Sequence, residues 1–179
     1  MSCNRLYRID LADRGSRLTP RQMYRALLIS IDLDLGPDPR HGAGLLWHRE
    51  GDLVVVSLRP HIDFAPTRLL GRTTELDMSG LGDAGAEVPV ALRLVRQTPE
   101  THLNGWIESA LSQHGVTAPV TARALSDVYP TGRVEDGALP AAEVETALSA
   151  DQLRTLVTTG VGHCRECGFG LPVPAEYLT

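Results

Sequence analysis

The amino-acid sequence predicts an α+β protein made of two tandem β-α-β-β-α-β halves. The chain has 179 residues, which suits one large domain or two small ones. Its composition, 42% hydrophobic and 22% charged, is ordinary for a globular protein. Segments of alternating apolar residues recur between segments with helical spacing. We therefore expect one half over residues 1–96 and the other over residues 97–179.

The first half is expected to contain one helix and a series of strands. Thr19 is typical of an N-cap, and Pro20 is typical of a first helical residue, so a helix should run from here to about Leu33. A turn at Gly51 separates two apolar segments and predicts a hairpin. The last strand of the series is expected to close this half. Strands are predicted at 3–11, 44–49, 53–58, 69–76 and 88–96.

The second half repeats this order up to a glycine-rich segment. Thr98 and Pro99 precede a helix that should end at Gly115, and Ser149 should cap a short helix over 150–157. Strands are predicted at 116–128 and 142–148, and a last one after the glycine-rich segment 160–170. This order resembles two ferredoxin-like (RRM-like) folds in tandem, the second one abbreviated.

Charge and hydropathy favour a cytoplasmic protein with no membrane partner. The longest apolar runs, 26–31 and 53–58, are shorter than the roughly 20 residues that cross a bilayer, and residues 1–11 are too polar for a signal peptide. The net charge of −5 argues against a protein that coats nucleic acid over its whole surface. However, residues 1–72 carry 11 arginines and 8 acidic residues, so a basic face is expected in the first half.

Four glycines stand in a segment of eleven residues, at positions 160, 162, 168 and 170. Such a loop exposes backbone N–H groups and can surround a phosphate, although the same pattern is also typical of a tight turn before a buried strand. It is neither a Walker loop nor a dinucleotide-binding loop. No Gly-Lys-Ser/Thr follows, and the glycines precede a strand instead of opening a helix.

The segment GVGHCRECGFGL, residues 160–171, resembles the C-terminal glycine-rich loop G-h-G-x-x-K-x-x-G-h-G-L of CRISPR pre-crRNA-processing endoribonucleases. The first strand, the helix opening at 19–25, the strand at 45–49 and the segment 92–99 follow the order found in the CasE branch of this RAMP superfamily, the nuclease of type I-E Cascade. The resemblance covers most of the chain. Residues 59–88 and 120–148 match loosely, and the chain is shorter than typical members.

The resemblance implies cleavage of RNA without a metal or another cofactor. The repeat stem-loop of pre-crRNA is bound, a ribose 2′-hydroxyl attacks the adjacent phosphate, and a 2′,3′-cyclic phosphate remains. The product hairpin then stays bound in a Cascade-type complex, so CRISPR repeat RNA and the other effector subunits, especially the backbone subunit, are the implied partners. This reaction needs a base, an acid and a cation beside the phosphate.

The resemblance also implies where these groups lie. Tyr24 stands at the helix position where the family has its histidine, Arg21 near the position of a catalytic tyrosine, and Arg165 at the cationic position of the loop. Because tyrosine has a pKa near 10 and is a weak base, His163 or His41 is the alternative base. The RNA-binding residues are expected to be Arg5, Arg8, Arg14, Arg17, Arg21, Arg25, Gly160, Gly162, Gly168 and Gly170. No role is expected for His48, His61, His102 or His114, which fit strand or helix surfaces.

Three other interpretations stay open at this point. The protein is a catalytically weak or inactive subunit that binds the crRNA hairpin, or a ferredoxin-like RNA-binding domain outside CRISPR, although two phenylalanines give it few base-stacking side chains. The third is a zinc-stabilised structural module, in which Cys164 and Cys167 supply two of four ligands, with His163 and Cys3 as further candidates. A thioredoxin-like role is disfavoured because this C-x-x-C does not open a helix.

Overall fold

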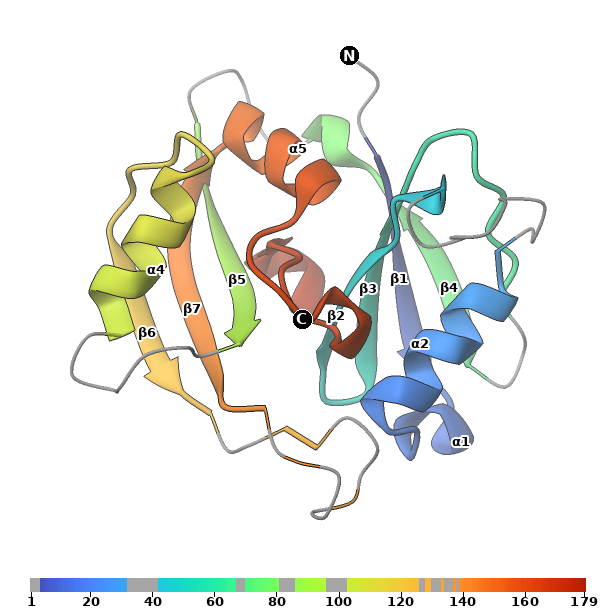
Figure 1. The fold of residues 1–179 in the computed structure, drawn as a ribbon. Helices are drawn as coiled ribbons and strands as arrows, with labels where there is room; N and C mark the ends of the chain where they lie inside the picture. Colours follow the sequence, from blue (N-terminus) through green and yellow to red (C-terminus); the bar gives the residue numbers. More distant parts are fainter. Residues whose placement is uncertain are drawn as a thin grey trace.

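The protein, described by a computed structural model, folds into two antiparallel sheets with helices packed against them (Figure 1). The structure describes residues 4–31, 42–66, 70–80, 86–95, 103–125, 128–129, 133, 137 and 139–179. The strands of the first sheet are β1 (Arg5–Leu11), β2 (Leu46–Glu50), β3 (Leu53–Leu58) and β4 (Gly71–Leu76). Those of the second are β5 (Glu87–Val95), β6 (Val120–Ala124), β7 (Ala141–Ser149) and β8 (Val173–Pro174).

The α-helices among the described residues are α1 (Asp13–Ser16), α2 (Pro20–Ile29), α4 (Leu103–Ser112) and α5 (Ala150–Thr159). Short 3-10 turns follow at η1 (Met78–Gly80), η4 (Arg165–Cys167) and η5 (Ala175–Leu178). No helix within the described part of the chain is long and apolar enough to cross a membrane.

The two sheets share one arrangement of strands. Their orders are β2-β3-β1-β4 and β6-β7-β5-β8, so in each sheet the first strand of the half lies between the third and the fourth. All neighbouring strands are antiparallel. This arrangement confirms the expected fold class of tandem ferredoxin-like halves. The second half is abbreviated at its last strand, β8, which consists of two residues.

The predicted strand at 88–96 belongs to the second half and not, as expected, to the first. The segment 88–96 was expected to close the first half, but β5 is the first strand of the second sheet and pairs along its whole length with β7. The changeover between the sheets therefore lies between Leu76 and Glu87. The expected boundary at 96–97 falls outside the described residues. Alternation along a strand shows which residues share a face, but it carries no information about the neighbouring strand.

The centre of the first sheet is buried on both faces. Along β3, Val54 and Val56 pack with the apolar side of α2, whereas Leu53 and Val55 join the core of the second half. Ser57 lies on the same face of β3 as Leu53 and Val55, and its hydroxyl donates to the carbonyl of Val157 in α5 at 2.6 Å. A nearly uninterrupted apolar strand is what a sheet covered on both sides requires. The helix α5 thus packs against both sheets and joins the two halves.

The helix α2 begins where its sequence predicts. The Thr19 side chain accepts from the backbone N–H of Gln22 at 3.3 Å, and the Gln22 side chain accepts from the N–H of Thr19 at 2.9 Å. This capping box, with Pro20 next to it, fixes the first turn. Met23 and Leu27 form the buried side of the helix. The helix ends at Ile29, earlier than the expected Leu33, which lies outside the described residues.

Candidate functional site

The glycine-rich loop, residues 160–170, packs against the first half of the protein. Its 3-10 turn η4 contacts both α2 and β2. A Cβ atom placed on Gly168 would lie 2.9 Å from Cζ3 of Trp47, and one on Gly160 would lie 3.0 Å from Cδ2 of Leu46. Both neighbours belong to β2, so these glycines allow the loop to approach that strand closely. Loop and helix, more than 130 residues apart in the sequence, thus lie side by side (Figure 1).

The four glycines of this loop all have positive φ, between 68° and 89°. Three of them are buried, and their N–H groups are bound internally: Gly160 to the carbonyl of Leu156 at 2.7 Å, Gly168 to that of Arg165 at 3.2 Å, and Gly170 to that of Arg93 at 2.8 Å. Among the described residues only Gly162 of the four has no such internal bond. Three of the four glycines expected to bind RNA are therefore used to build the loop.

The predicted catalytic residues lie on the two elements that meet here. Arg21 is exposed on α2, whereas Tyr24 is half-buried and packs at the edge of the first-sheet core. In the loop, His163 is exposed and Arg165 is half-buried, its Nε 3.4 Å from the position that a Cβ on Gly160 would occupy. His41, the other candidate base, lies outside the described residues. Arg21 and Tyr24 thus lie on α2, and Arg165 lies on the turn η4 that contacts this helix.

The arginines expected to bind RNA fall into two groups. Four of them are exposed on α1, α2 and the connection between these helices, and none forms an ion pair within the part of the chain that the structure describes: Arg14, Arg17, Arg21 and Arg25. The other two are already engaged. Arg5 binds the carboxylate of Glu75 through two hydrogen bonds, of 2.7 and 2.5 Å. Arg8 binds Asp10 at 2.9 Å and the carbonyl of Thr179 at 2.6 Å.

The two engaged arginines, Arg5 and Arg8, lie on opposite faces of β1. Arg8 shares a face of β1 with Leu6, which belongs to the core of the second half, so it lies on the side of the first sheet opposite to α2. Arg5 is on the α2 side with Tyr7, and its guanidinium lies 5.4 Å from the Tyr7 ring centroid. Of the arginines expected to bind RNA, those that are exposed and form no ion pair among the described residues therefore lie in the α1–α2 region.

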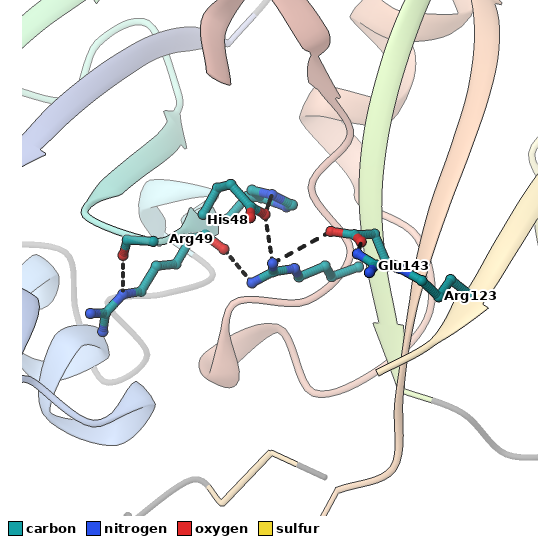
Figure 2. Close-up of polar contacts among 7 residues, drawn as sticks. His48, Arg49, Arg123 and Glu143 are labelled. Carbon is teal, nitrogen blue, oxygen red and sulfur yellow. Dashed lines mark hydrogen bonds and ion pairs between the residues drawn. The ribbon is translucent and has the colours of Figure 1, made fainter. Parts of the chain in front are cut away.

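A polar bridge that the sequence did not reveal joins the two sheets, and Figure 2 shows it around His48, Arg49 and Glu143. The guanidinium of Arg93 in β5 donates to the backbone carbonyl of Arg49 and to the carboxylate of Glu50, both at 2.5 Å. It also lies 3.5 Å from the Glu143 carboxylate in β7, which Arg123 binds as well. Burial acts to raise the pKa of Glu143, but Arg123 and Arg93 hold it below its usual value.

This bridge continues to the start of α2. The Arg49 side chain donates to the carbonyl of Leu18 at 2.7 Å and to that of Ser16, and its Nε donates to the carbonyl of Gly51 at 3.0 Å. Burial lowers the pKa of the Arg49 guanidinium. Arg49 thus fixes the connection between α1 and α2, and Arg93 fixes Arg49. Alternation along β5 places Arg93 on the face opposite to Leu92 and Leu94, but a partner on the other sheet cannot be derived from one strand.

His48 was expected on a strand surface, but it is completely buried between the halves. Burial, and secondly the nearby Arg93 charge, lowers its pKa to about 3, so the ring is neutral near pH 7. Neither ring nitrogen has a hydrogen-bond partner among the described residues. The error has a physical reason. On β2 the side that alternation marks as outward is covered by the second half of the chain.

The structure shows where two of the candidate zinc ligands lie. Cys164 and Cys167 are half-buried free thiols at the two ends of η4, and Cys3 lies outside the described residues. Within the described ranges, no group of three or more His, Cys, Asp or Glu side chains is placed to hold a metal ion.

Comparison with known proteins gives likeness in fold but not in sequence. No protein-family model and no curated protein matches the chain. Among solved structures, the CRISPR endoribonuclease Cse3 bound to a 19-nt RNA matches with a TM-score of 0.73 and 18% identity over 96% of this chain and 99% of that one. Cas6e from Escherichia coli K-12 matches with a TM-score of 0.62 and 18% identity, over 94% and 97%.

A third match comes from a larger assembly. A chain of E. coli Cascade bound to a PAM-containing double-stranded DNA target has a TM-score of 0.56 and 15% identity, over 93% of this chain and 96% of that one. All three matches span nearly the whole length of both proteins. The chain therefore has the fold of the CRISPR endoribonuclease Cse3 and of the CRISPR-associated protein Cas6e.

Proposed function

We propose that this protein is a CRISPR RNA-processing subunit, which binds the repeat stem-loop of pre-crRNA and cleaves it without a metal. One observation carries this proposal: the glycine-rich loop contacts α2 in a fold shared with an RNA-bound Cse3. Two elements that the sequence alone linked to RNA processing are thereby neighbours. The E. coli Cascade match supports the further proposal that the protein keeps the product hairpin within a Cascade-type complex and contacts its backbone subunit.

The α1–α2 region is the proposed surface for the RNA backbone. Its four exposed arginines, at positions 14, 17, 21 and 25, form no ion pairs within the described residues, so their charges are available to phosphates. Guanidinium groups bind phosphate oxygens in pairs. Because A-form RNA is recognised mainly through its shape and its backbone, such a basic surface suits a stem-loop. We add the Gly162 amide to this surface, because it has no internal bond in the described structure.

We assign the chemistry to residues of both elements. His163 accepts the proton of the 2′-hydroxyl, because imidazole is the side chain suited to proton transfer near neutral pH. The O2′ atom attacks phosphorus, and Arg165 stabilises the additional negative charge. Tyr24 donates a proton to the departing O5′ atom, so the products are a 2′,3′-cyclic phosphate and a 5′-hydroxyl. Arg21 holds the phosphate in place.

A second candidate function is binding without cleavage. It is favoured by one feature of this chain, the phenol of Tyr24 on α2 where the resemblance implies an imidazole. Binding requires charge and shape, which the α1–α2 arginines supply, whereas cleavage requires a base as well.

The experiment that separates the two candidates is RNA cleavage in EDTA. Purified protein is incubated with a panel of type I-E repeat hairpins, beside the Tyr24→Phe, His163→Ala and Arg165→Ala variants, and the ends of the products are identified. We expect cyclic-phosphate products from the wild type and a loss of at least a hundredfold in rate for His163→Ala. Tight binding without products in all four samples would establish the binding-only function, and no binding would contradict the proposal as a whole.

A further inference from the structure

Two cysteines enclose Arg165 in the glycine-rich loop, and the proposed function makes no use of them. The turn η4 follows Cys164 and ends with Cys167, and both side chains are half-buried free thiols. Cys164 has a φ of 56°, the one positive value at a non-glycine residue among the described residues. A conformation that side chains rarely adopt is thus used at the first of the two cysteines.

The turn brings the two cysteines within range of each other. The N–H of Cys167 donates to the carbonyl of Cys164 at 3.0 Å, which closes the turn. An i to i+3 turn of this kind keeps the terminal Cα atoms within about 7 Å. Disulfides connect Cα atoms about 4.4–6.8 Å apart. The separation that the turn allows between the two Cα atoms therefore overlaps the range that a disulfide spans.

The described surroundings of the two cysteines do not form a complete metal site. Zinc needs four ligands, and within the described ranges no group of three or more suitable side chains contains these cysteines. Burial, and secondly the Glu166 carboxylate, raises the pKa of both thiols, that of Cys167 to about 11. Such thiols are unreactive near pH 7 and become nucleophilic as the pH rises.

We propose that Cys164 and Cys167 form a redox modification site, which a low-molecular-weight disulfide converts into an intramolecular disulfide. The Cys164 thiolate attacks one sulfur of the small disulfide, forms a mixed disulfide and releases one small thiolate. The Cys167 thiolate then attacks the Cys164 sulfur and expels the second small thiolate. The cysteine pair gives up two electrons and two protons, and the small disulfide is reduced to two thiols. The new bond closes a ring that contains Arg165.

The test uses the full chain and oxidised glutathione as the probe, at a pH of about 9, where the thiolate fraction is larger. After oxidation, remaining thiols are blocked with N-ethylmaleimide and peptides are analysed by mass spectrometry. The 160–170 segment should lose about 2 Da and carry no maleimide. Cys164→Ser and Cys167→Ser should each stop at a glutathione adduct on the remaining cysteine. Maleimide on both cysteines, a persistent adduct in the wild type, or a bond to Cys3 would overturn the proposal.

A second measurement, which rests on the proposed function, separates the proposed redox site from the proposed RNA contact at Arg165. RNA held at Arg165 covers the turn, so a saturating repeat hairpin should slow disulfide formation at least fivefold. Closure at an unchanged rate would contradict RNA contact at Arg165 and leave the redox site intact. Failure to close in RNA-free protein would overturn the redox site, whatever the RNA does.

Discussion

The backbone carbonyl of Arg93 accepts the N–H of Gly170 at 2.8 Å, so the residue that joins the two sheets also holds the glycine-rich loop. The side chain of the same residue donates to the Arg49 carbonyl and to Glu50 on the first sheet. Arg49 in turn holds the connection before α2. A continuous set of hydrogen bonds therefore runs from the loop to the helix that carries Arg21 and Tyr24.

Replacing Arg93 should disturb both sheets at once. We expect Arg93→Gln to lower the free energy of unfolding by about 1–3 kcal/mol, because Glu50 and Glu143 lose a charged partner in a partly buried place. Arg5→Gln is the matched control, since Arg5 lies 2.5 Å from the Glu75 carboxylate, as Arg93 does from Glu50, but at a more exposed site, and its effect should be smaller. Urea unfolding measures both. Equal losses in the two variants would show that the bridge contributes no more than a surface ion pair.

The buried His48 should make the protein sensitive to acid. Its pKa is lowered from 6.5 to about 3 in the folded state. Between these values the unfolded chain binds more protons, so the free energy of unfolding decreases as the pH is lowered. We expect a slope of up to about 1.4 kcal/mol per pH unit below pH 6.5. His48→Leu should flatten the unfolding profile between pH 6.5 and 4.5, and the exposed His61→Leu should not. Parallel profiles for wild type and His48→Leu would contradict this assignment.

Gly170 is expected to tolerate no side chain. A Cβ there would lie 2.3 Å from the carbonyl oxygen of Val161, at a φ of 89°. Gly170→Ala should destabilise the protein by about 3 kcal/mol or more. Gly51→Ala separates the steric effect from the backbone effect, because Gly51 also has a positive φ, 54°, but has open space around it. That variant should lose about 1 kcal/mol. Similar losses in urea unfolding would mean that the contact with Val161 is unimportant.

The α1–α2 arginines should determine how RNA binding depends on salt. Each phosphate contact that is lost reduces the slope of log K against log salt by about 0.7–0.9. The double variant Arg21→Gln with Arg25→Gln should therefore have a slope shallower by about 1–2 than the wild type. Arg72→Gln is the control, since Arg72 is exposed but shares a face of β4 with Leu76, opposite to α2. An unchanged slope in the double variant would show that the RNA phosphates do not contact Arg21 or Arg25 on α2.

The sequence predicted those features that depend on neighbouring residues. The N-caps at Thr19 and Ser149, the hairpin turn at Gly51 and the existence of each strand follow from local chemistry and alternation. The spacing of the glycines identified residues 160–170 as a candidate RNA-binding loop. Its structural role, packing against Trp47 of β2, depends on a contact between distant segments.

What the sequence missed are contacts between the halves. The placement of β5 in the second sheet and the burial of His48 depend on which surfaces meet after folding. The same is true of the pairing of Arg93 with Glu50. A single strand shows two faces with different composition, but it does not show that its polar face will be covered.

The central claim is that α2 and the glycine-rich loop form one RNA-binding surface, and the dissociation constant of a repeat hairpin tests it most directly. It is measured for wild type, Arg21→Glu in the helix, Arg165→Glu in the loop and Arg72→Glu on the opposite face, with unfolding midpoints confirming that each variant is folded. We predict at least tenfold weaker binding for the first two variants and wild-type affinity for Arg72→Glu. Wild-type affinity in either Arg21→Glu or Arg165→Glu would contradict the claim.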